Sequence, residues 1–430
     1  MSRLSIPQGA AVSVGAVLGT GVISVPALGA QVAGPASLVA WVALIVLSVP
    51  LAATFAALGA RHADAGGVST YVRRAFGDRG ATVVGWLFYF SVPTGAPVAG
   101  YMAGAYVEAA FGGGQRTILL TTAGLVATVT VMNYFGLRVS GRVQLVLAAT
   151  LATLLLVATI AALPHARVAN LQPFAPHGWA AIVPAAAVLV WSFAGWEALT
   201  SLAGEFRDPA RDVPRATAIA LAVVGSLYLA VAATSLAVLG PATATTEAPL
   251  AELMMVGIGG PVTVITAVVA VLLTLGAMNA YHASAAKLGA ALARDGALPG
   301  WLERGSGIGQ VPRRSLAVVT AADFLALTVA AVAHLGTRQI ILVTVGVFVI
   351  VYVFGSAAAL RLLPRRTWAH RGAIVALVSS VALLATIGPS LLWPLGVAVA
   401  ALVYDHRSRR RVRARRLPEP EHREPAGTAV

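Results

Sequence analysis

The stretch GAVLGTGVISVP, residues 15–26, combines features that a continuous buried helix avoids. Glycine costs about 1 kcal/mol relative to alanine inside a helix, and here two glycines flank Thr20 while Pro26 closes the stretch. This pattern predicts that an otherwise apolar helix unwinds near Thr20. The alternative is close packing against another helix, because Gly15 and Gly19 form a pair of small residues with helical spacing.

A second stretch, WSFAGWE at residues 191–197, has a related composition. It places Gly195 and the carboxylic acid Glu197 in the middle of a long apolar segment. An acid at the centre of a membrane helix costs at least about 2.5 kcal/mol, so such a residue is functional by default. The alternative is a buried Glu that is hydrogen-bonded for packing alone. We therefore expect a second interruption here.

The composition places both stretches in a membrane protein. Of the 430 residues, 58% are hydrophobic and 11% are charged, whereas a soluble globular chain carries roughly 25% charge. This excludes a soluble enzyme, a disordered chain and a nucleic-acid-binding module. Cysteine is absent, which excludes disulfides, thiolate metal sites and a cysteine nucleophile.

Apolar segments long enough to cross a bilayer, about 20 residues each, recur along the chain. The sequence predicts an all-α membrane protein with twelve transmembrane helices. They are expected at residues 7–31, 37–58, 81–108, 117–134, 143–163, 180–204, 216–239, 262–292, 315–334, 339–362, 373–387 and 390–403.

The basic residues test this topology, because cytoplasmic loops of membrane proteins carry the excess of Lys and Arg. With the N-terminus inside, all but three of the 30 Lys and Arg residues fall on the cytoplasmic side. The three exceptions are Arg116, Arg167 and Arg338. We expect an even number of spans and cytoplasmic termini. Cleavage of the first span as a signal peptide would spoil this alternation, so the span is expected to be retained.

The chain is expected to form one transporter domain over residues 1–404, followed by a basic tail. The tail, residues 405–430, is rich in Arg, Pro and Glu, and we expect it to be disordered, cytoplasmic and close to anionic lipid. The loop after the second span contains Val68, Tyr71 and Val72 on one helical face and Arg73 on the other. This spacing is typical of a short helix in the membrane interface, although an ordinary basic loop fits equally well.

Signatures of an enzyme are missing from the sequence. The single lysine, Lys287, follows Ala286, so no nucleotide-binding P-loop is present. No pair of histidines has the spacing of a zinc-protease motif, and no serine-hydrolase elbow occurs. We expect neither enzymatic activity nor a cofactor or metal.

The two interrupted stretches open equivalent halves of the predicted topology. The stretch near Thr20 lies in the first span and the stretch near Gly195 in the sixth, and interrupted segments at corresponding positions mark transporter sites. We expect five spans plus five related by inverted topology, with repeats at about 7–163 and 178–362. Helices 11 and 12, at about 371–404, would lie outside the repeat.

Several motifs resemble one known group of proteins. They are LGTGVISVPAL at 18–28, ADAGGVSTYV at 63–72, WSFAGWEAL at 191–199 and GEFRDPARDVPRA at 204–216. Together they resemble the amino acid–polyamine–organocation transporter superfamily, and within it the bacterial exporters of L-methionine and branched-chain amino acids. The resemblance implies a core with discontinuous helices 1 and 6 and a substrate site at the two breaks.

In related transporters the substrate carboxylate lies on backbone N–H groups of the first break and the amine on carbonyl groups of the sixth-span break. Glu197 matches an acid implicated in proton sensing in some relatives. The residues of this chain expected to bind substrate are Val17, Gly19, Thr20, Gly21, Trp191, Phe193, Ala194, Gly195, Trp196 and Tyr281.

Physical chemistry supports such a site, because desolvating a zwitterion is prohibitive without partners for both of its charges. A half-helix beginning after Gly21 offers N–H groups and a positive dipole end. A half-helix ending before Gly195 offers carbonyl groups. Glu197 is the one charged side chain expected nearby, which favours neutral apolar substrates such as Leu, Ile, Val or Met. Each aromatic residue expected there could instead serve core packing.

The coupling must come from an ion gradient or from exchange, since no nucleotide site exists. Glu197 is the candidate for proton coupling, while roles for His282 and Asp323 stay open and a sodium site is not excluded. We expect a proton-linked amino acid exporter in the bacterial inner membrane. The alternatives are an importer or exchanger of the same fold, a membrane sensor or scaffold that does not transport, and, more remotely, a channel.

Overall fold

The computed structural model describes residues 5–18, 21–62, 67–137, 141–196, 206–305 and 310–415, and these ranges contain helices and loops but no β-strand. The first half of the chain forms α1 (Ile6–Val17), α2 (Gly21–Ala33), α3 (Ser37–Arg61), α4 (Gly67–Phe76), α5 (Asp78–Phe111), α6 (Gly114–Tyr134), α7 (Gly141–Ala162) and α8 (Ile182–Leu189). The second half forms α10 (Pro209–Leu239), α11 (Pro249–Gly257), α12 (Val262–Arg294), α13 (Arg313–Val332), α14 (Thr337–Leu362), α15 (Trp368–Ile387) and α16 (Leu392–Arg415).

Nine helical runs in the described ranges are long and apolar enough to cross a membrane. Two of them, Gly21–Arg61 and Trp368–Ser408, are 41 residues long, about twice the length that one crossing needs. Each joins two predicted spans through a short 3-10 turn, Gly34–Ala36 or Gly388–Leu391. The sixth predicted span corresponds to a shorter apolar run, Trp179–Phe193. The all-helical membrane architecture is confirmed, and the total of twelve spans stays a prediction.

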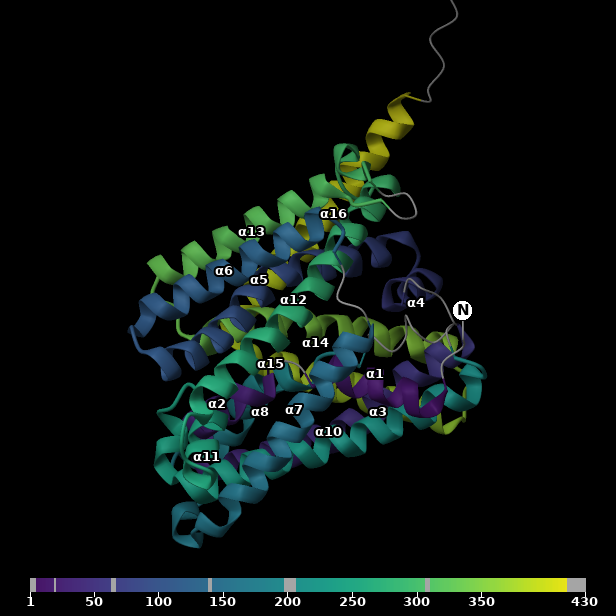
Figure 1. Cartoon of the computed structure of the whole chain (residues 1–430). Coiled ribbons are helices and arrows are strands. Elements are labelled where there is room, and N and C mark those ends of the chain that lie inside the picture. The colour runs from purple at the N-terminus through teal and green to yellow at the C-terminus, as the bar shows by residue number, and fades with distance from the viewer. Residues whose placement is uncertain are drawn as a thin grey trace, which may run out of the picture.

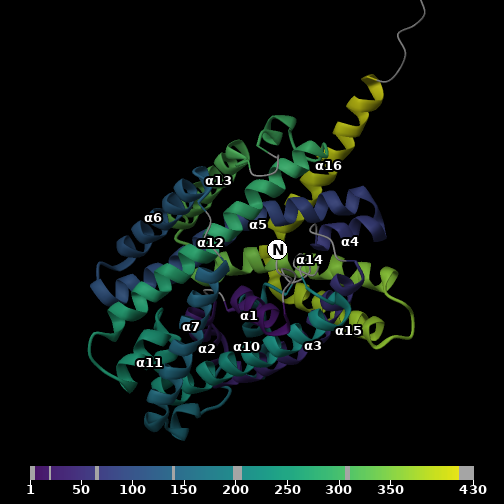
Figure 2. The same cartoon turned by 45° about the vertical axis from the view of Figure 1, so that its right-hand side comes forward.

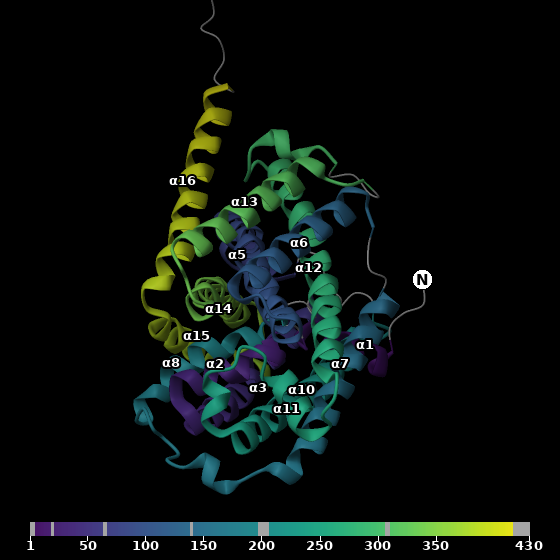
Figure 3. The ribbon, with the colours of Figure 1, turned by 60° about the vertical axis from the view of Figure 1, so that its left-hand side comes forward.

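Many of the helices gather in two groups (Figures 1 and 2). One group contains α5, α6, α12 and α13, which all contact one another. The other contains α1, α2, α3, α8 and α10, where α10 packs on α1 and α3, and α8 packs on α2 and α3. Helix α14 contacts α5, α3 and α8, so it joins the two groups. Figure 3 shows α16 along the outside of the bundle.

Small residues let the helices of the first group approach closely. A Cβ atom added to Gly104 of α5 would lie 2.8 Å from the carbonyl oxygen of Ile118 on α6, and one added to Gly100 would lie 2.5 Å from Cγ2 of Thr122. Gly100 and Gly104 are four residues apart, so they lie on the same helix face. This spacing of small residues is typical of close helix contacts in membranes, and it fixes α5 against α6.

The short helix expected after the second span is present as α4, but its apolar face does not lie in lipid. Val68, Tyr71 and Val72 are buried in the protein core, because α4 packs against α5 and α14. The guanidinium group of Arg361 on α14 lies 4.5 Å from the ring centroid of Phe76 and donates to the carbonyl of Ala75. The short helix is therefore confirmed, its apolar face packs on protein, and its location in the membrane interface stays a prediction.

The C-terminal segment also differs from expectation. The tail was expected to lose regular structure from residue 405, but α16 continues as a helix to Arg415. Asp405 is buried and lies 3.8 Å from the guanidinium group of Arg79 on α5, and the hydroxyl of Ser408 donates to the carbonyl of Gly296. These contacts hold the beginning of the tail against the bundle. Residues 416–430 lie outside the described residues.

Candidate functional site

The first helical segment ends in the middle of the predicted first span. Helix α1 ends at Val17, and the N–H of Leu18 donates to the carbonyl of Val14 at 2.7 Å. Leu18 has φ −69° and ψ 65°, which is not helical. Helix α2 then begins at Gly21. Gly19 and Thr20, both expected in the site, lie outside the described residues. The first four N–H groups of α2 have no intrahelical partner, as at any helix start.

A second interruption lies in the sixth predicted span. Helix α8 tightens into the 3-10 turn η5, Val190–Phe193, and the backbone becomes extended at Ala194 with φ −70° and ψ 138°. Gly195 follows with φ +126°, a conformation that is accessible to glycine and strained for other residues. A helix cannot continue through this geometry. Glu197, the expected proton-coupling residue, lies outside the described residues.

The two interruptions are in direct contact. A Cβ atom added to Gly21 would lie 2.8 Å from Cδ1 of Trp191 and 3.2 Å from Cα of Ser192. Both distances are shorter than ordinary carbon–carbon contacts, so only glycine fits at the start of α2 without a shift of η5. The amino end of α2 therefore lies against the carboxyl end of the α8–η5 segment.

Aromatic side chains from neighbouring helices hold the ends of the broken segments. The hydroxyl of Tyr228 on α10 donates to the carbonyl of Val17 at 2.7 Å, and the hydroxyl of Tyr352 on α14 donates to the carbonyl of Phe193 at 3.4 Å. The rings of Trp41, Phe193 and Tyr228 form a cluster with centroid distances of 5.5–5.8 Å. Burying aromatic rings in tilted and edge-on pairs stabilises this arrangement.

The structure brings together most of the described residues that were expected to bind substrate. Gly21, Trp191 and the backbone at Ala194 and Gly195 lie at the two interruptions. Val17, Phe193 and Trp196 are almost completely buried. The ring of Phe193 packs in the aromatic cluster, so its carbonyl is better placed than its side chain to meet a ligand.

Tyr281 stands apart from this group. It lies on α12, in the other group of helices, and its side chain is 43% exposed. Its expected place in the substrate pocket stays a prediction.

Sequence reasoning missed the serine hydroxyl groups that line the interruptions, although it had included Trp196. The Oγ atoms of Ser24 and Ser192 and the Nε1 atom of Trp196 are buried, and each lacks a hydrogen-bond partner among the described residues. Oγ of Ser192 would lie 3.0 Å from a Cβ atom at Gly21. Buried polar groups are normally paired, so these atoms mark a place where a ligand or water could bind. Both serines lie inside the quoted stretches, yet periodicity does not show which face they occupy.

The interruptions offer complementary partners for a dipolar molecule. The start of α2 presents N–H donors and a positive dipole end. Carbonyl oxygens at the end of η5 are acceptors, and a carbonyl oxygen can accept two hydrogen bonds. No cluster of three His, Asp or Glu residues that could hold a metal occurs within the ranges that the structure describes.

Comparison with known proteins gives one consistent result. A sequence model of the amino acid permease family matches residues 4–405. The uncharacterized amino acid permease YecA of Bacillus subtilis (strain 168) is 32% identical over 402 residues, which cover 92% of this chain and 94% of that protein.

Two further relatives are similar over about half of their length. The L-methionine/branched-chain amino acid exporter YjeH of Escherichia coli (strain K12) is 40% identical over 232 residues, which cover 53% of this chain and 54% of that protein. The branched-chain amino acid permease BcaP of Bacillus subtilis (strain 168) is 28% identical over 243 residues, which cover 51% of each chain.

Proposed function

This chain belongs to the amino acid permease family, and we propose that within it the protein exports neutral apolar L-amino acids by secondary active transport. The observation that carries the proposal is the contact between the two interrupted helices at Gly21 and Ser192. Alternating access would move helices on either side of this contact. Permeases are transporters and not enzymes, in agreement with the missing enzyme motifs.

The carboxylate of the substrate would bind at the start of α2. Gly19, Thr20 and Gly21 are the residues proposed to supply N–H groups there, because the helix dipole favours a negative charge. The absence of a side chain at Gly21 lets η5, with its carbonyl groups, approach the start of α2 closely. Hydrogen bonds to a charged group contribute about 1.5–3 kcal/mol each, so several together offset much of the cost of removing the carboxylate from water.

The ammonium group would bind at the carboxyl end of η5. Carbonyl groups between Trp191 and Ala194 end the helical segment there, and the hydroxyl of Ser192, which has no hydrogen-bond partner among the described residues, lies beside them. The ammonium group has three donors and no acceptor, which matches a surface of carbonyl and hydroxyl oxygens. The distance between the two subsites is set by the contact at Gly21.

The side chain of the substrate is proposed to be neutral and apolar. Three described residues, Val17, Trp191 and Trp196, surround the interruptions, and none of these three side chains is charged. A cationic or anionic side chain would meet no counter-charge from them. The names of two relatives, an exporter of L-methionine and branched-chain amino acids and a branched-chain amino acid permease, support the same substrate class.

Proton coupling is proposed to involve Glu197, which directly follows Trp196 in the chain. A carboxyl group beside the ammonium subsite would change its charge with the local proton concentration. Coupling to H⁺, rather than Na⁺ or pure exchange, is part of the proposal.

The topology completes the proposal. The two runs of 41 residues would each cross the bilayer twice and the interrupted α8 segment once more, giving twelve crossings in a five-plus-five inverted repeat. The distribution of Lys and Arg favours cytoplasmic termini. A location in the bacterial inner membrane is part of the proposal, in keeping with the bacterial relatives.

The test is counterflow of labelled leucine and methionine in proteoliposomes. Gly21→Ala should reduce counterflow about tenfold or more, since a loss of 1.4 kcal/mol in binding corresponds to a factor of ten. Gly124→Ala is the matched control, because a Cβ atom there would meet nothing within 4 Å. Glu197→Gln should flatten the dependence of transport on pH.

Two outcomes would contradict the proposal at different points. If Gly21→Ala showed normal counterflow, the proposal that the substrate carboxylate binds at the start of α2 would be refuted. Failure of the unmodified protein to exchange any neutral amino acid would reject the substrate class, and a membrane sensor or scaffold would become the better description.

A further inference from the structure

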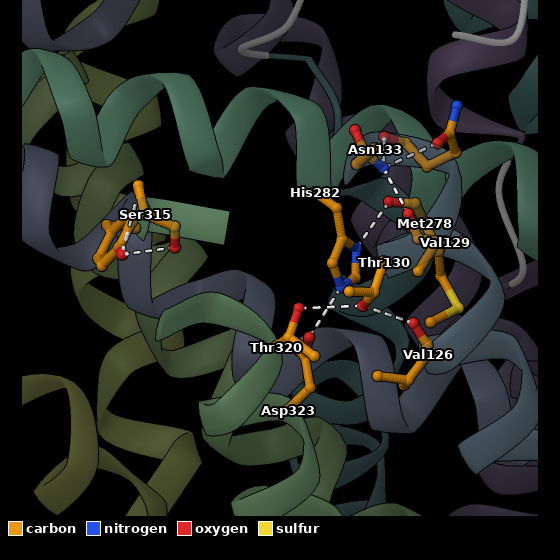
Figure 4. Close-up of polar contacts among 11 residues, drawn as sticks. Val126, Val129, Thr130, Asn133, Met278, His282, Ser315, Thr320 and Asp323 are labelled. Atoms are coloured by element: carbon orange, nitrogen blue, oxygen red, sulfur yellow. Dashed lines mark hydrogen bonds and ion pairs between the residues drawn. The ribbon is translucent and has the colours of Figure 1, made fainter. Parts of the chain in front are cut away.

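Two ionisable side chains outside the interruptions are paired inside the membrane region. His282 lies in the middle of α12 and Asp323 in the middle of α13, and both side chains are completely buried. Their Nε2 and Oδ2 atoms are 2.8 Å apart. Figure 4 shows the ring of His282 pointing across the helix contact toward the carboxyl group of Asp323. Ionisable residues at such depth are costly and mark function.

The hydrogen bonds of His282 determine how many protons the pair carries. Its Nδ1 atom lies 2.7 Å from the carbonyl oxygen of Met278. A carbonyl oxygen can only accept, so Nδ1 must carry a hydrogen. The other ring nitrogen faces a carboxyl oxygen, and that contact also needs one hydrogen. Either Nε2 carries it, giving an imidazolium and a carboxylate, or Oδ2 carries it, giving an imidazole and a carboxylic acid.

Both forms contain the same number of protons and are neutral overall. Removing the shared proton would place a lone pair of the ring against a carboxylate oxygen, or, after a change of tautomer, a lone pair against the carbonyl of Met278. It would also leave one uncompensated negative charge in a fully buried place. Oδ1 of Asp323 has no hydrogen-bond partner among the described residues, so nothing described there would stabilise the added charge. Unpaired buried charges are strongly unfavourable.

We propose that His282 and Asp323 together form a proton-binding site that is loaded in this conformation. Loading adds one proton from water to the imidazole–carboxylate pair, forming one N–H or O–H bond, and release returns that proton to water. Release requires α12 and α13 to separate or water to enter between them. A role of this site in coupling rests on the proposed transport function. The number of protons on the pair does not, because it follows from the hydrogen bonds of His282.

Two further polar side chains lie one helical turn from the pair. Asn279, three residues before His282 on the same face of α12, bonds through its Oδ1 atom to Nδ2 of Asn133 on α6 at 2.8 Å. Asn133 also lines a cavity of about 20 Å³ together with Lys287 and Gln310. That volume holds about one water molecule.

Beside the pair lies a hydrogen bond between two threonine hydroxyl groups, neither of which is titratable. The hydroxyl groups of Thr130 on α6 and Thr320 on α13 are 2.9 Å apart, and Thr130 also donates to the carbonyl of Val126. Figure 4 shows these threonines next to Asp323. They supply a control site with a similar location and no exchangeable charge.

Other ionisable residues on these four helices are tyrosines, a lysine or groups in the terminal turns. They are Asp78, Arg79, Tyr89, Tyr101, Tyr106 and Glu108 on α5, Arg116 and Tyr134 on α6, Tyr281, Lys287 and Arg294 on α12, and Arg313 and Arg314 on α13. Asp323 is thus the one carboxyl group in the middle of the four helices, and His282 the one histidine.

Asp323→Asn is the decisive variant, because it keeps the hydrogen bonds and removes the proton exchange. The amide can donate to Nε2 while Nδ1 still donates to Met278, so the packing of α12 on α13 is retained. We expect counterflow at the wild-type rate, since exchange needs no net proton movement, and complete loss of the stimulation of leucine transport by a pH gradient. Thr130→Val should keep both activities.

A transport-independent measurement examines the proton itself. In the purified protein, ¹⁵N NMR of labelled histidine identifies the His282 ring by its loss in His282→Gln, and infrared spectroscopy identifies a protonated carboxyl group by its loss in Asp323→Asn. Near neutral pH we expect either a doubly protonated ring or a protonated Asp323. A neutral ring beside an ionised carboxylate would overturn the proton site.

The two sets of results separate the two proposals. If the unmodified protein exchanges no neutral amino acid, the substrate proposal fails, while the spectra still decide the proton site. If exchange is normal and Asp323→Asn retains its full response to a pH gradient, the substrate proposal stands and the role of the pair in coupling is refuted.

Discussion

The hydroxyl of Tyr228 on α10 donates a 2.7 Å hydrogen bond to the carbonyl of Val17, the last residue of α1. The same ring packs edge-on against Phe193 of η5, with centroids 5.5 Å apart. Tyr228 therefore contacts both broken segments. Its hydroxyl donates to the carbonyl at the end of α1, and its ring packs on η5. A broken helix leaves carbonyl groups without partners, and Tyr228 supplies one of the missing donors.

Tyr228→Phe should weaken this support while keeping the aromatic packing. Leaving a buried carbonyl without its donor costs about 1–3 kcal/mol, so we expect a lower unfolding temperature and a higher KM for counterflow. Tyr89→Phe is the control, because Tyr89 also donates to a carbonyl, that of Ser315, but lies in the other helix group. Equal effects of the two substitutions on KM would contradict a special role for Tyr228.

Ser192→Ala separates a binding role from a structural one. The hydroxyl of Ser192 is buried without a described partner, so its removal should leave the protein as stable as before or slightly more stable. If it binds the ammonium group, KM should rise about tenfold, since hydrogen bonds to charged groups contribute about 1.5–3 kcal/mol. Ser235→Ala on α10 removes another such hydroxyl and should leave KM unchanged. An unaltered KM in Ser192→Ala would exclude the hydroxyl from the site.

Gly104→Ala should destabilise the contact between α5 and α6. The added methyl group would lie 2.8 Å from the carbonyl oxygen of Ile118, and overpacking of this kind costs about 1–3 kcal/mol. Thermal unfolding in lipid or detergent would measure the loss. Gly396→Ala on α16 meets nothing within 4 Å and should be neutral or stabilising by up to about 1 kcal/mol. Similar melting temperatures for both variants would be incompatible with the close approach described.

Glu247, in the loop before α11, should make stability depend on pH. Although the residue as a whole is exposed, partial desolvation raises the pKa of its carboxyl group above the ordinary value, and the neighbouring carboxylate of Glu108 raises it further. Because the folded pKa is raised, the stabilising contribution is present below the unfolded pKa and is lost as the pH rises through the folded value. Glu247→Gln should therefore be more stable than the unmodified protein at neutral pH, with the difference vanishing on acidification.

Thermal unfolding of the Glu247 variant and the unmodified protein, measured from acidic to neutral pH, tests this expected difference in stability. Glu303→Gln, which removes the same charge from an exposed residue of the loop after α12, provides the control. A difference between the Glu247 variant and the unmodified protein that stays constant with pH would show that titration of Glu247 is not responsible.

Much of this architecture could be predicted from local sequence. Apolar runs of about 20 residues define where a helix can cross a bilayer, because in hydrocarbon the backbone must satisfy its own hydrogen bonds. The glycines around Thr20 and at Gly195 indicate where helices lose regular structure, and α1 and η5 end beside them. The resemblance of several sequence motifs to those of known transporters indicated the family.

The pairings between distant segments could not be predicted in this way. The spacing of Val68, Tyr71 and Val72 indicated an amphipathic helix, yet an apolar face can meet lipid or protein equally well, and here it meets α5 and α14. In a soluble protein an apolar face points to the core, but next to a membrane that inference fails because lipid is also apolar.

The sequence by itself determined an all-helical membrane protein of the amino acid permease family, with two weak points in its helices, because composition and glycine placement act locally. Only the tertiary structure decided that Gly21 meets Ser192 and that His282 bonds to Asp323, since these contacts join residues far apart in the chain. Helix packing selects such partners through shape and through the requirement that buried polar groups be paired. Neither condition can be read from one segment alone.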